Sequence, residues 1–99
     1  MSLRFGDVLF EHVRYTRSSG ALAVRRHDEI PPARHQTESR EGWFVAYDAD
    51  GDLNALDIWG ALAQLEQTGE ITVTLHDGTV LRSPDAADYI REQEAQAAA

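Results

Sequence analysis

The chain contains no cysteine and no lysine among its 99 residues, so all nine basic residues are arginine. The absence of cysteine excludes disulfide bonds, a thiolate nucleophile and a zinc site with thiolate ligands. The absence of lysine excludes Schiff-base chemistry and a lysine general base. Stability must therefore come from a hydrophobic core, and two large classes of enzyme are excluded by composition.

Long apolar runs are also absent. The first ten residues have no apolar stretch long enough for a signal peptide, and no segment approaches the length of a membrane span. A hydrophobic content of 42% is too high for a disordered chain, and 99 residues are typical of one domain. We therefore expect a single soluble domain over residues 1–99, located in the cytoplasm and without a membrane partner.

Charge is distributed unevenly over the chain, whose net charge is -8. Residues 1–40 hold seven Arg and five acidic residues, a net +2, whereas residues 41–99 hold two Arg and twelve acidic residues, a net -10. The two parts attract each other. Between subunits, or with another protein, such attraction guides docking and raises the association rate.

Three pairs of segments rich in β-branched and aromatic residues predict three β-hairpins. The expected strand pairs are 7–15 with 21–26, 43–47 with 53–58, and 71–75 with 80–82. The segment 27–41 contains Pro31 and Pro32 and has no apolar periodicity, which predicts a surface loop.

Two helices are expected beside the strands. A short central helix covers 60–68 and ends at Gly69, and a C-terminal helix begins after the capping residue Ser83, with Pro84 at its first position. Residues 95–99 should fray. The predicted fold class is α+β, with a mainly antiparallel sheet of about six short strands in three hairpins.

The hairpin around Asp50-Gly51 is the most detailed local prediction, because glycine there adopts the positive φ of a tight turn. A bulged turn predicts these cross-strand pairs: Asp48 with Asp52, Tyr47 with Leu53, and Val45 with Ala55. Phe44 and Leu56 then share the other face. Apolar side chains on both faces are typical of a sheet covered on both sides, by helix, a second sheet layer or another subunit.

Two motifs in the middle of the chain carry a family likeness. Residues 15–24 (YTRSSGALAV) contain a Tyr, a short turn and an apolar strand, and residues 47–58 (YDADGDLNALDI) contain a Tyr-Asp-x-x-Gly hairpin before an apolar-acid-apolar strand. Over roughly 15–61 the chain resembles domain-of-unknown-function family 2283, a family of small prokaryotic proteins. Thr16 stands where that family usually has Asp, and Ala23 where it often has an aromatic residue. The resemblance implies a fold built on these hairpins and no established activity.

Asp48, Asp50 and Asp52 form a carboxylate cluster that suits a hard cation such as calcium. The spacing does not fit an EF-hand, because Gly51 is the fourth loop residue where the sixth is required, and Trp59 occupies the twelfth position. Asp and Gly are also ordinary turn formers. A solvated turn therefore explains the cluster better, and we assign no metal ligand and no cofactor.

Histidine and serine show no pattern typical of catalysis. The histidines are His12, His27, His35 and His76. None belongs to a His-Glu-x-x-His run or a helical i, i+4 pair, no serine lies in a Gly-x-Ser-x-Gly elbow, and no glycine-rich phosphate loop is present. Adjacent strand residues point to opposite faces, so the two His-Asp steps do not form acid-base dyads by themselves. We assign no catalytic residue.

Six arginines around the first hairpin and the following loop form the one group suited to a phosphate backbone. They are Arg14, Arg17, Arg25, Arg26, Arg34 and Arg40. The -10 charge of residues 41–99 would repel a duplex, and no helix-turn-helix or aromatic sheet signature is present. Arginine-mediated contact with nucleic acid is therefore only the third hypothesis.

The leading hypothesis is a non-enzymatic interaction or assembly module that forms a homodimer, with a different protein as the other partner considered. Large aromatic residues contribute much of the energy of interfaces, although each is equally suited to a core. The candidate anchors are Trp43, Phe44, Tyr47 and Trp59.

The alternative hypothesis is a small ligand-binding or acid-base enzyme domain that uses Asp57 or His76. Partial burial beside Trp59 would raise the pKa of Asp57, although the same residue could cap the helix that follows.

Overall fold

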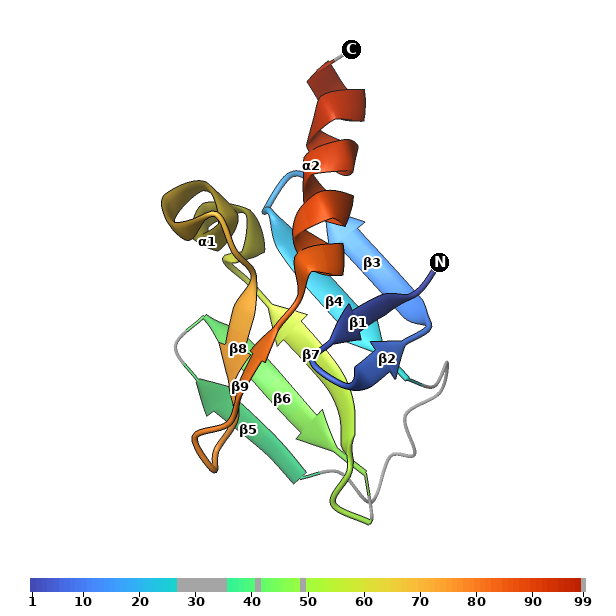
Figure 1. Cartoon of the computed structure of the whole chain (residues 1–99), viewed down its shortest axis with the longest axis vertical. Coiled ribbons are helices and arrows are strands. Elements are labelled where there is room, and N and C mark those ends of the chain that lie inside the picture. Colours follow the sequence, from blue (N-terminus) through green and yellow to red (C-terminus); the bar gives the residue numbers. More distant parts are fainter. Residues whose placement is uncertain (27–35, 41, 49, 99) are drawn as a thin grey trace.

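The centre of the fold is a five-stranded antiparallel sheet with the strand order β3-β4-β7-β6-β5 (Figure 1). The computed structural model describes residues 1–26, 36–40, 42–48 and 50–98. Its elements, in chain order, are β1 (Leu3–Phe5), β2 (Val8–Phe10), β3 (His12–Thr16), β4 (Ala21–Arg25), β5 (Gln36–Arg40), β6 (Trp43–Tyr47), β7 (Leu53–Ile58), α1 (Ala61–Thr68), β8 (Thr72–Thr74), β9 (Val80–Arg82) and α2 (Pro84–Ala98). The predicted α+β class with mainly antiparallel strands is confirmed. Neither helix in the described part of the chain is long and apolar enough to cross a membrane.

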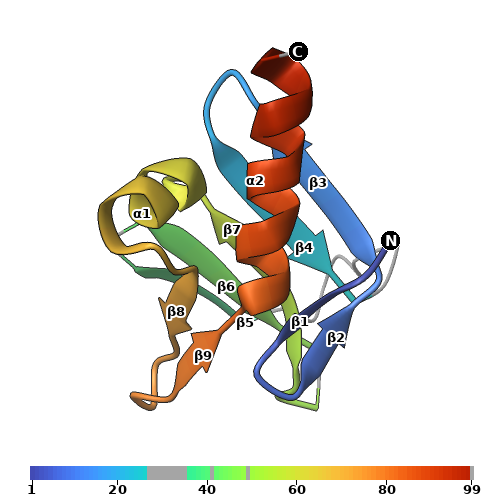
Figure 2. The same ribbon diagram turned by 45° about the horizontal axis from the view of Figure 1, so that its top comes forward.

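One face of the sheet forms the hydrophobic core, because side chains alternate between the two faces of each strand. Its central residues, each at most 2% exposed, are Leu22, Val24, Val45, Leu56 and Ile58. Both helices and the hairpins β1–β2 and β8–β9 lie over this face (Figures 1 and 2). Phe5 and Phe10 add an edge-to-face pair to the core, with ring centroids 5.7 Å apart.

We call the opposite face of the sheet the open face. Neither helix and neither short hairpin of the described residues lies over it. Strand register and alternation assign to it His12, Arg14, Ala23, Arg25, Phe44, Ala46, Ala55 and Asp57. Helices and hairpins of the described residues thus cover one face of the sheet, and coverage of the other face by another subunit stays a prediction.

Two parts of the predicted strand pattern were wrong. The expected strand 7–15 is divided at Glu11, and its first part, β2, pairs with β1 in an additional hairpin. Strands of three residues are too short to show periodicity, so the sequence did not reveal β1. In the predicted loop 27–41, residues 36–40 form β5, which pairs with β6 at the sheet edge. Residues 27–35 and 41 lie outside the described residues.

The β6–β7 hairpin contains a bulge that changes its predicted register. Tyr47 is opposite Leu53 as predicted, but a shift between Ala46 and Tyr47 leaves Asn54 as an extra residue on β7. Asp48 and Asp52 also meet as predicted, since the Asp48 N–H donates to the Asp52 carbonyl at 2.8 Å. The predicted pair of Val45 with Ala55 was wrong, because Val45 is opposite Leu56 and Ala46 is opposite Ala55. Phe44 and Leu56 consequently lie on opposite faces, because one extra residue reverses the alternation of all positions beyond it.

Both predicted helices are present. Gly69 ends α1 with φ 79°, and its N–H donates to the Leu65 carbonyl. Gly60 precedes α1 and no side chain caps that helix, so Asp57 is not its cap. Ser83 Oγ accepts the Ala86 N–H of α2 at 3.0 Å, as a helix cap should. Residues 95–98, predicted to fray, continue α2, since alanine has the highest helix propensity.

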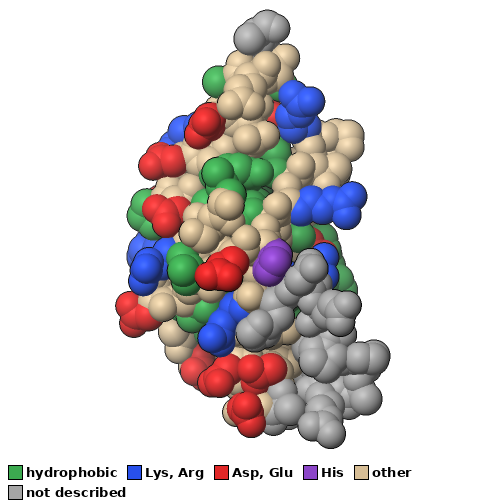
Figure 3. All heavy atoms as spheres, turned by 90° about the vertical axis from the view of Figure 1, so that its right-hand side faces the viewer, with side chains coloured by type: hydrophobic (Ala, Val, Ile, Leu, Met, Phe, Trp, Pro, Cys, Tyr) green, Lys and Arg blue, Asp and Glu red, His purple; other side chains and the backbone are tan. Residues whose placement is uncertain are grey.

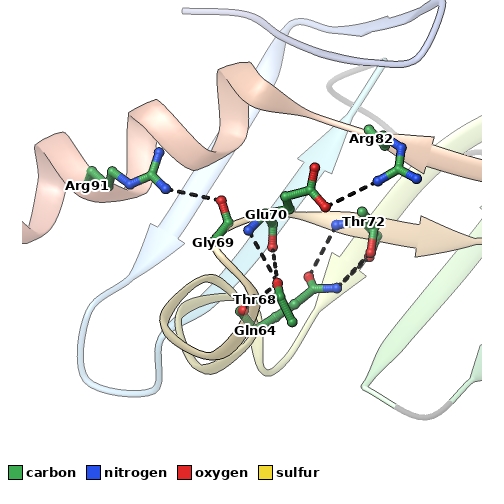
Figure 4. A network of polar contacts seen from close by, with 7 residues as sticks. All are labelled: Gln64, Thr68, Gly69, Glu70, Thr72, Arg82 and Arg91. Carbon is green, nitrogen blue, oxygen red and sulfur yellow. Dashed lines mark hydrogen bonds and ion pairs between the residues drawn. The ribbon is translucent and has the colours of Figure 1, made fainter.

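Polar contacts attach α1 to its neighbours (Figure 4). The Gln64 amide donates to the Thr72 carbonyl at 3.0 Å, and its oxygen accepts the Thr72 N–H at 3.3 Å, as a neighbouring strand would. Arg91 of α2 donates to the Gly69 carbonyl at 3.1 Å. The short helix is thereby fixed between β8 and α2.

Candidate functional site

A shallow hollow of about 410 Å³ lies on the open face across β4, β7 and β6. The floor is formed by alanines, whose short side chains leave space between longer neighbours. The floor and rim include Ala23, Ala46, Ala55, Arg25, Phe44 and Asp57. The sequence did not predict this hollow, because the register that aligns its alanines depends on the bulge at Asn54.

Two aromatic rings stand exposed at one side of the hollow. Phe44 is 37% exposed and Trp59 is 42% exposed. Their ring centroids are 4.5 Å apart with planes at 82°, an edge-to-face pair. The backbone N–H of Trp59 donates to the Gly42 carbonyl at 3.0 Å, which holds the end of β7 against the start of β6. The two rings thus form a continuous apolar surface on a rigid backbone.

Asp57 places a carboxyl group beside this apolar surface. On the open face it lies between Ala23 of β4 and Phe44 of β6, neither of which offers a polar side chain. Burial raises the pKa of Asp57 above its ordinary value. Its carboxylate is therefore less well solvated than that of an ordinary surface aspartate.

The other two predicted anchors, Trp43 and Tyr47, pack in or against the core. Tyr47 is only 5% exposed. Its hydroxyl lies 2.7 Å from Nδ1 of His76 in the β8–β9 turn, and the two rings meet edge to face at 5.1 Å. Of the four predicted aromatic anchors, only Phe44 and Trp59 are therefore available on the surface.

The structure separates the two residues of the acid-base hypothesis. Asp57 lies on the open face, whereas His76 contacts Tyr47 on the core side of the sheet. They cannot act on one substrate atom. Any site that uses Asp57 must work without His76.

Asp48, Asp50 and Asp52 lie in the β6–β7 turn, and their carboxylate oxygens are within 4.8 Å of one another. Asp48 Oδ1 accepts the backbone N–H groups of Asp50 at 2.9 Å and Asp52 at 3.0 Å. Figure 3 shows acidic side chains gathered at the lower end of the molecule, where Figure 1 has this turn. The hydrogen bonds account for the cluster as a turn motif.

The predicted arginine group is divided among different surroundings. Arg14 lies on the open face and Arg17 in the β3–β4 turn. Arg26 donates to the Leu53 carbonyl at 3.4 Å and so has a structural contact. Arg34 and the side chain of Arg40 lie outside the described residues, as do His27 and His35. Arg25 shares the open face with Arg14, so two of the six predicted arginines lie together on one described surface.

A second cavity of about 220 Å³ lies between the β8–β9 hairpin and the start of α2. Arg82 pairs with Glu70 at 3.2 Å, and Arg91 pairs with Asp88 at 3.6 Å. Its two positive charges are therefore matched by two negative ones, which leaves no net charge for an ionic ligand. The open face remains the stronger candidate.

Comparison with known proteins identifies no relative. No protein-family model matches the chain, and no curated protein and no solved structure matches it. The resemblance of residues 15–61 to domain-of-unknown-function family 2283 therefore stays a prediction.

Proposed function

We propose that this protein is a non-enzymatic assembly module of the cytoplasm that forms a homodimer through its open face. The observation that supports the proposal is the exposed pair Phe44 and Trp59 beside the alanine-lined hollow. Aromatic rings next to a pocket are the usual anchors of protein interfaces. A second copy offers the same rings and the same hollow, which a self-complementary interface requires.

The expected contribution of the rings is large enough to measure. About two-fifths of each residue's surface is exposed, so covering one of these residues buries roughly 80 Å² and contributes about 2 kcal/mol. A twofold interface contains each ring twice. Loss of the Phe44 ring should therefore weaken the dimer by about 4 kcal/mol, or about 1000-fold in Kd.

The test is the solution mass, measured by light scattering coupled to gel filtration at low and high salt. We expect a dimer that persists in high salt, because apolar contacts are not screened. Phe44→Glu should give a folded monomer. Val80→Glu is the matched control, because Val80 is a 50% exposed apolar residue on β9, outside the open face.

Three results would contradict the proposal. A monomer at every concentration and salt excludes the homodimer. Dissociation in high salt means that the +2 and -10 parts of the chain, rather than the rings, hold the dimer together. Complete unfolding of Phe44→Glu would mean that the ring acts as a core residue.

Asp57 supports a second candidate function, a small ligand-binding or acid-base domain. Its half-buried carboxyl beside the hollow has a raised pKa, which is a common property of functional carboxylates. This function requires a compound that binds the wild type but not Asp57→Asn in a metabolite screen. An ordinary Asp57 pKa by NMR, together with no such compound, excludes it.

A further inference from the structure

The side chains of the open face form two rows that cross the strands. The register aligns Arg14, Ala23, Asp57 and Phe44 in the first row. The second row contains His12, Arg25, Ala55 and Ala46. On each of the strands β4, β7 and β6, one row therefore has a long side chain where the other row has alanine.

This alternation can match a second copy of itself. We propose that two chains pack open face to open face about a twofold axis that runs between the sheets, perpendicular to the strands and midway between the two rows. Each strand then faces its own copy with the rows exchanged. Phe44 enters the space above the partner's Ala46, and the partner's Arg25 lies above Ala23, next to Asp57. The inference rests on the proposed homodimer and specifies how its two copies are arranged.

Packing favours this axis, because stacked sheets lie about 10 Å apart and need long side chains opposite short ones. With rows exchanged, Asp57 stands opposite the partner's Ala55, and Phe44 opposite the partner's Ala46. An axis parallel to the strands above β7 would instead set Asp57 against the partner's Asp57. Two carboxylates in one apolar contact repel each other.

Charge favours the same arrangement. Within one copy, burial raises the pKa of Asp57. The partner's Arg25 would lie one strand away, and neighbouring strands are about 4.8 Å apart, within reach of an arginine side chain. Arg25 also interacts within its own chain, but a guanidinium has several N–H donors and can serve two acceptors. Arg14 and His12 lie on the outer strand β3, at the rim, where charged groups stay hydrated.

A charge exchange tests the arrangement in the full-length protein. Asp57→Arg and Arg25→Asp should each weaken the dimer about 30-fold. The double variant should recover to within about threefold of the wild type, because it restores the pair in the opposite sense. The matched control exchanges Arg14 and Asp57, which lie on the same face and in the same row. We expect no recovery there.

Milder variants serve if a reversed charge prevents folding, as circular dichroism would reveal. Asp57→Asn and Arg25→Gln should then each raise the Kd of the dimer. The double variant should raise Kd by less than the product of the two separate fold-changes.

The possible results separate this inference from the proposed function. Unchanged dimers in all charge variants, with a monomeric Phe44→Glu, would keep the open-face dimer and overturn the arrangement. Recovery of the dimer in the Arg14 and Asp57 exchange would indicate a twofold axis that runs along β4. That result would also overturn the proposed arrangement. A monomeric wild type would overturn both, and protection of Phe44 in that monomer would show that the chain covers its own face.

Discussion

Ser83 connects the two ends of the chain, and its replacement gives the most direct test of the fold. Its side chain is 1% exposed. The Oγ–H donates to the Arg4 carbonyl of β1 at 2.7 Å, and Oγ accepts the Ala86 N–H of α2 at 3.0 Å. Ser83→Ala removes both bonds and leaves the backbone bonds of Ser83 in place.

The two losses have separate magnitudes. Loss of a helix N-cap costs about 1 kcal/mol, and the partly buried Arg4 carbonyl left without its partner costs about 1–3 kcal/mol. Ser83→Ala should therefore lower the free energy of unfolding by about 2–4 kcal/mol. For a domain of this size, the unfolding temperature should fall by about 10–25 °C.

Urea denaturation followed by circular dichroism, at a fixed protein concentration, measures this loss. Ser19→Ala is the control, because that serine is exposed and its Oγ lies 3.4 Å from the Thr16 carbonyl. It should change the free energy of unfolding by less than about 0.5 kcal/mol. If Ser83→Ala is equally mild, Ser83 does not attach β1 to α2, and the reasoning is refuted.

Three further substitutions test other parts of the fold by the same denaturation assay. Asn54 is 1% exposed, and its side-chain amide has no hydrogen-bond partner among the described residues. Asn54→Leu should therefore stabilise the protein by about 1–3 kcal/mol, and destabilisation would contradict this reasoning. Gly20 has φ +69°, and a Cβ there would lie 2.8 Å from Leu62 Cβ. At Gly51 a Cβ would meet no atom of the described residues within 4 Å. Gly20→Ala should therefore destabilise the protein more than Gly51→Ala, and equal losses would show that no clash occurs. The pKa of Asp77 lies below its ordinary value because its carboxylate accepts the backbone N–H of Thr79 within the turn. The ionised carboxylate therefore stabilises the folded protein above the ordinary pKa of Asp, and this stabilisation disappears as pH falls through the folded-state pKa. Asp77→Ala should therefore destabilise near neutral pH and have less effect in strong acid, whereas a pH-independent loss would contradict this origin.

Local signals in the sequence were sufficient for the helices and most hairpins. Ser83, Pro84 and Gly69 mark helix ends because each satisfies a local requirement of the backbone. β5 escaped prediction because its residues, QTESR, have little strand propensity and are held by pairing with β6. Such pairing joins distant segments and leaves no local signal.

The candidate site was predictable only in part. The sequence named Phe44, Trp59 and Asp57, because large aromatic residues and a carboxyl at a strand end are visible in any sequence. Their common face depended on the bulge at Asn54, which the turn residues did not indicate. One extra residue exchanged the faces of Phe44 and its neighbours on β6 relative to β7, and with them the surface on which the hollow lies.

The contact between the first strand and the last helix sets an order of events during synthesis. β1 leaves the ribosome before α2, because its partners Ser83 and Asp85 follow Arg4 by 79 and 81 positions. Contacts so distant along the chain form slowly, because a long loop must close before any of them stabilises the fold. We therefore expect Phe5 and Phe10 to stay exposed on the nascent chain until α2 is complete. Docking of α2 against β1 would then complete the burial of these two rings.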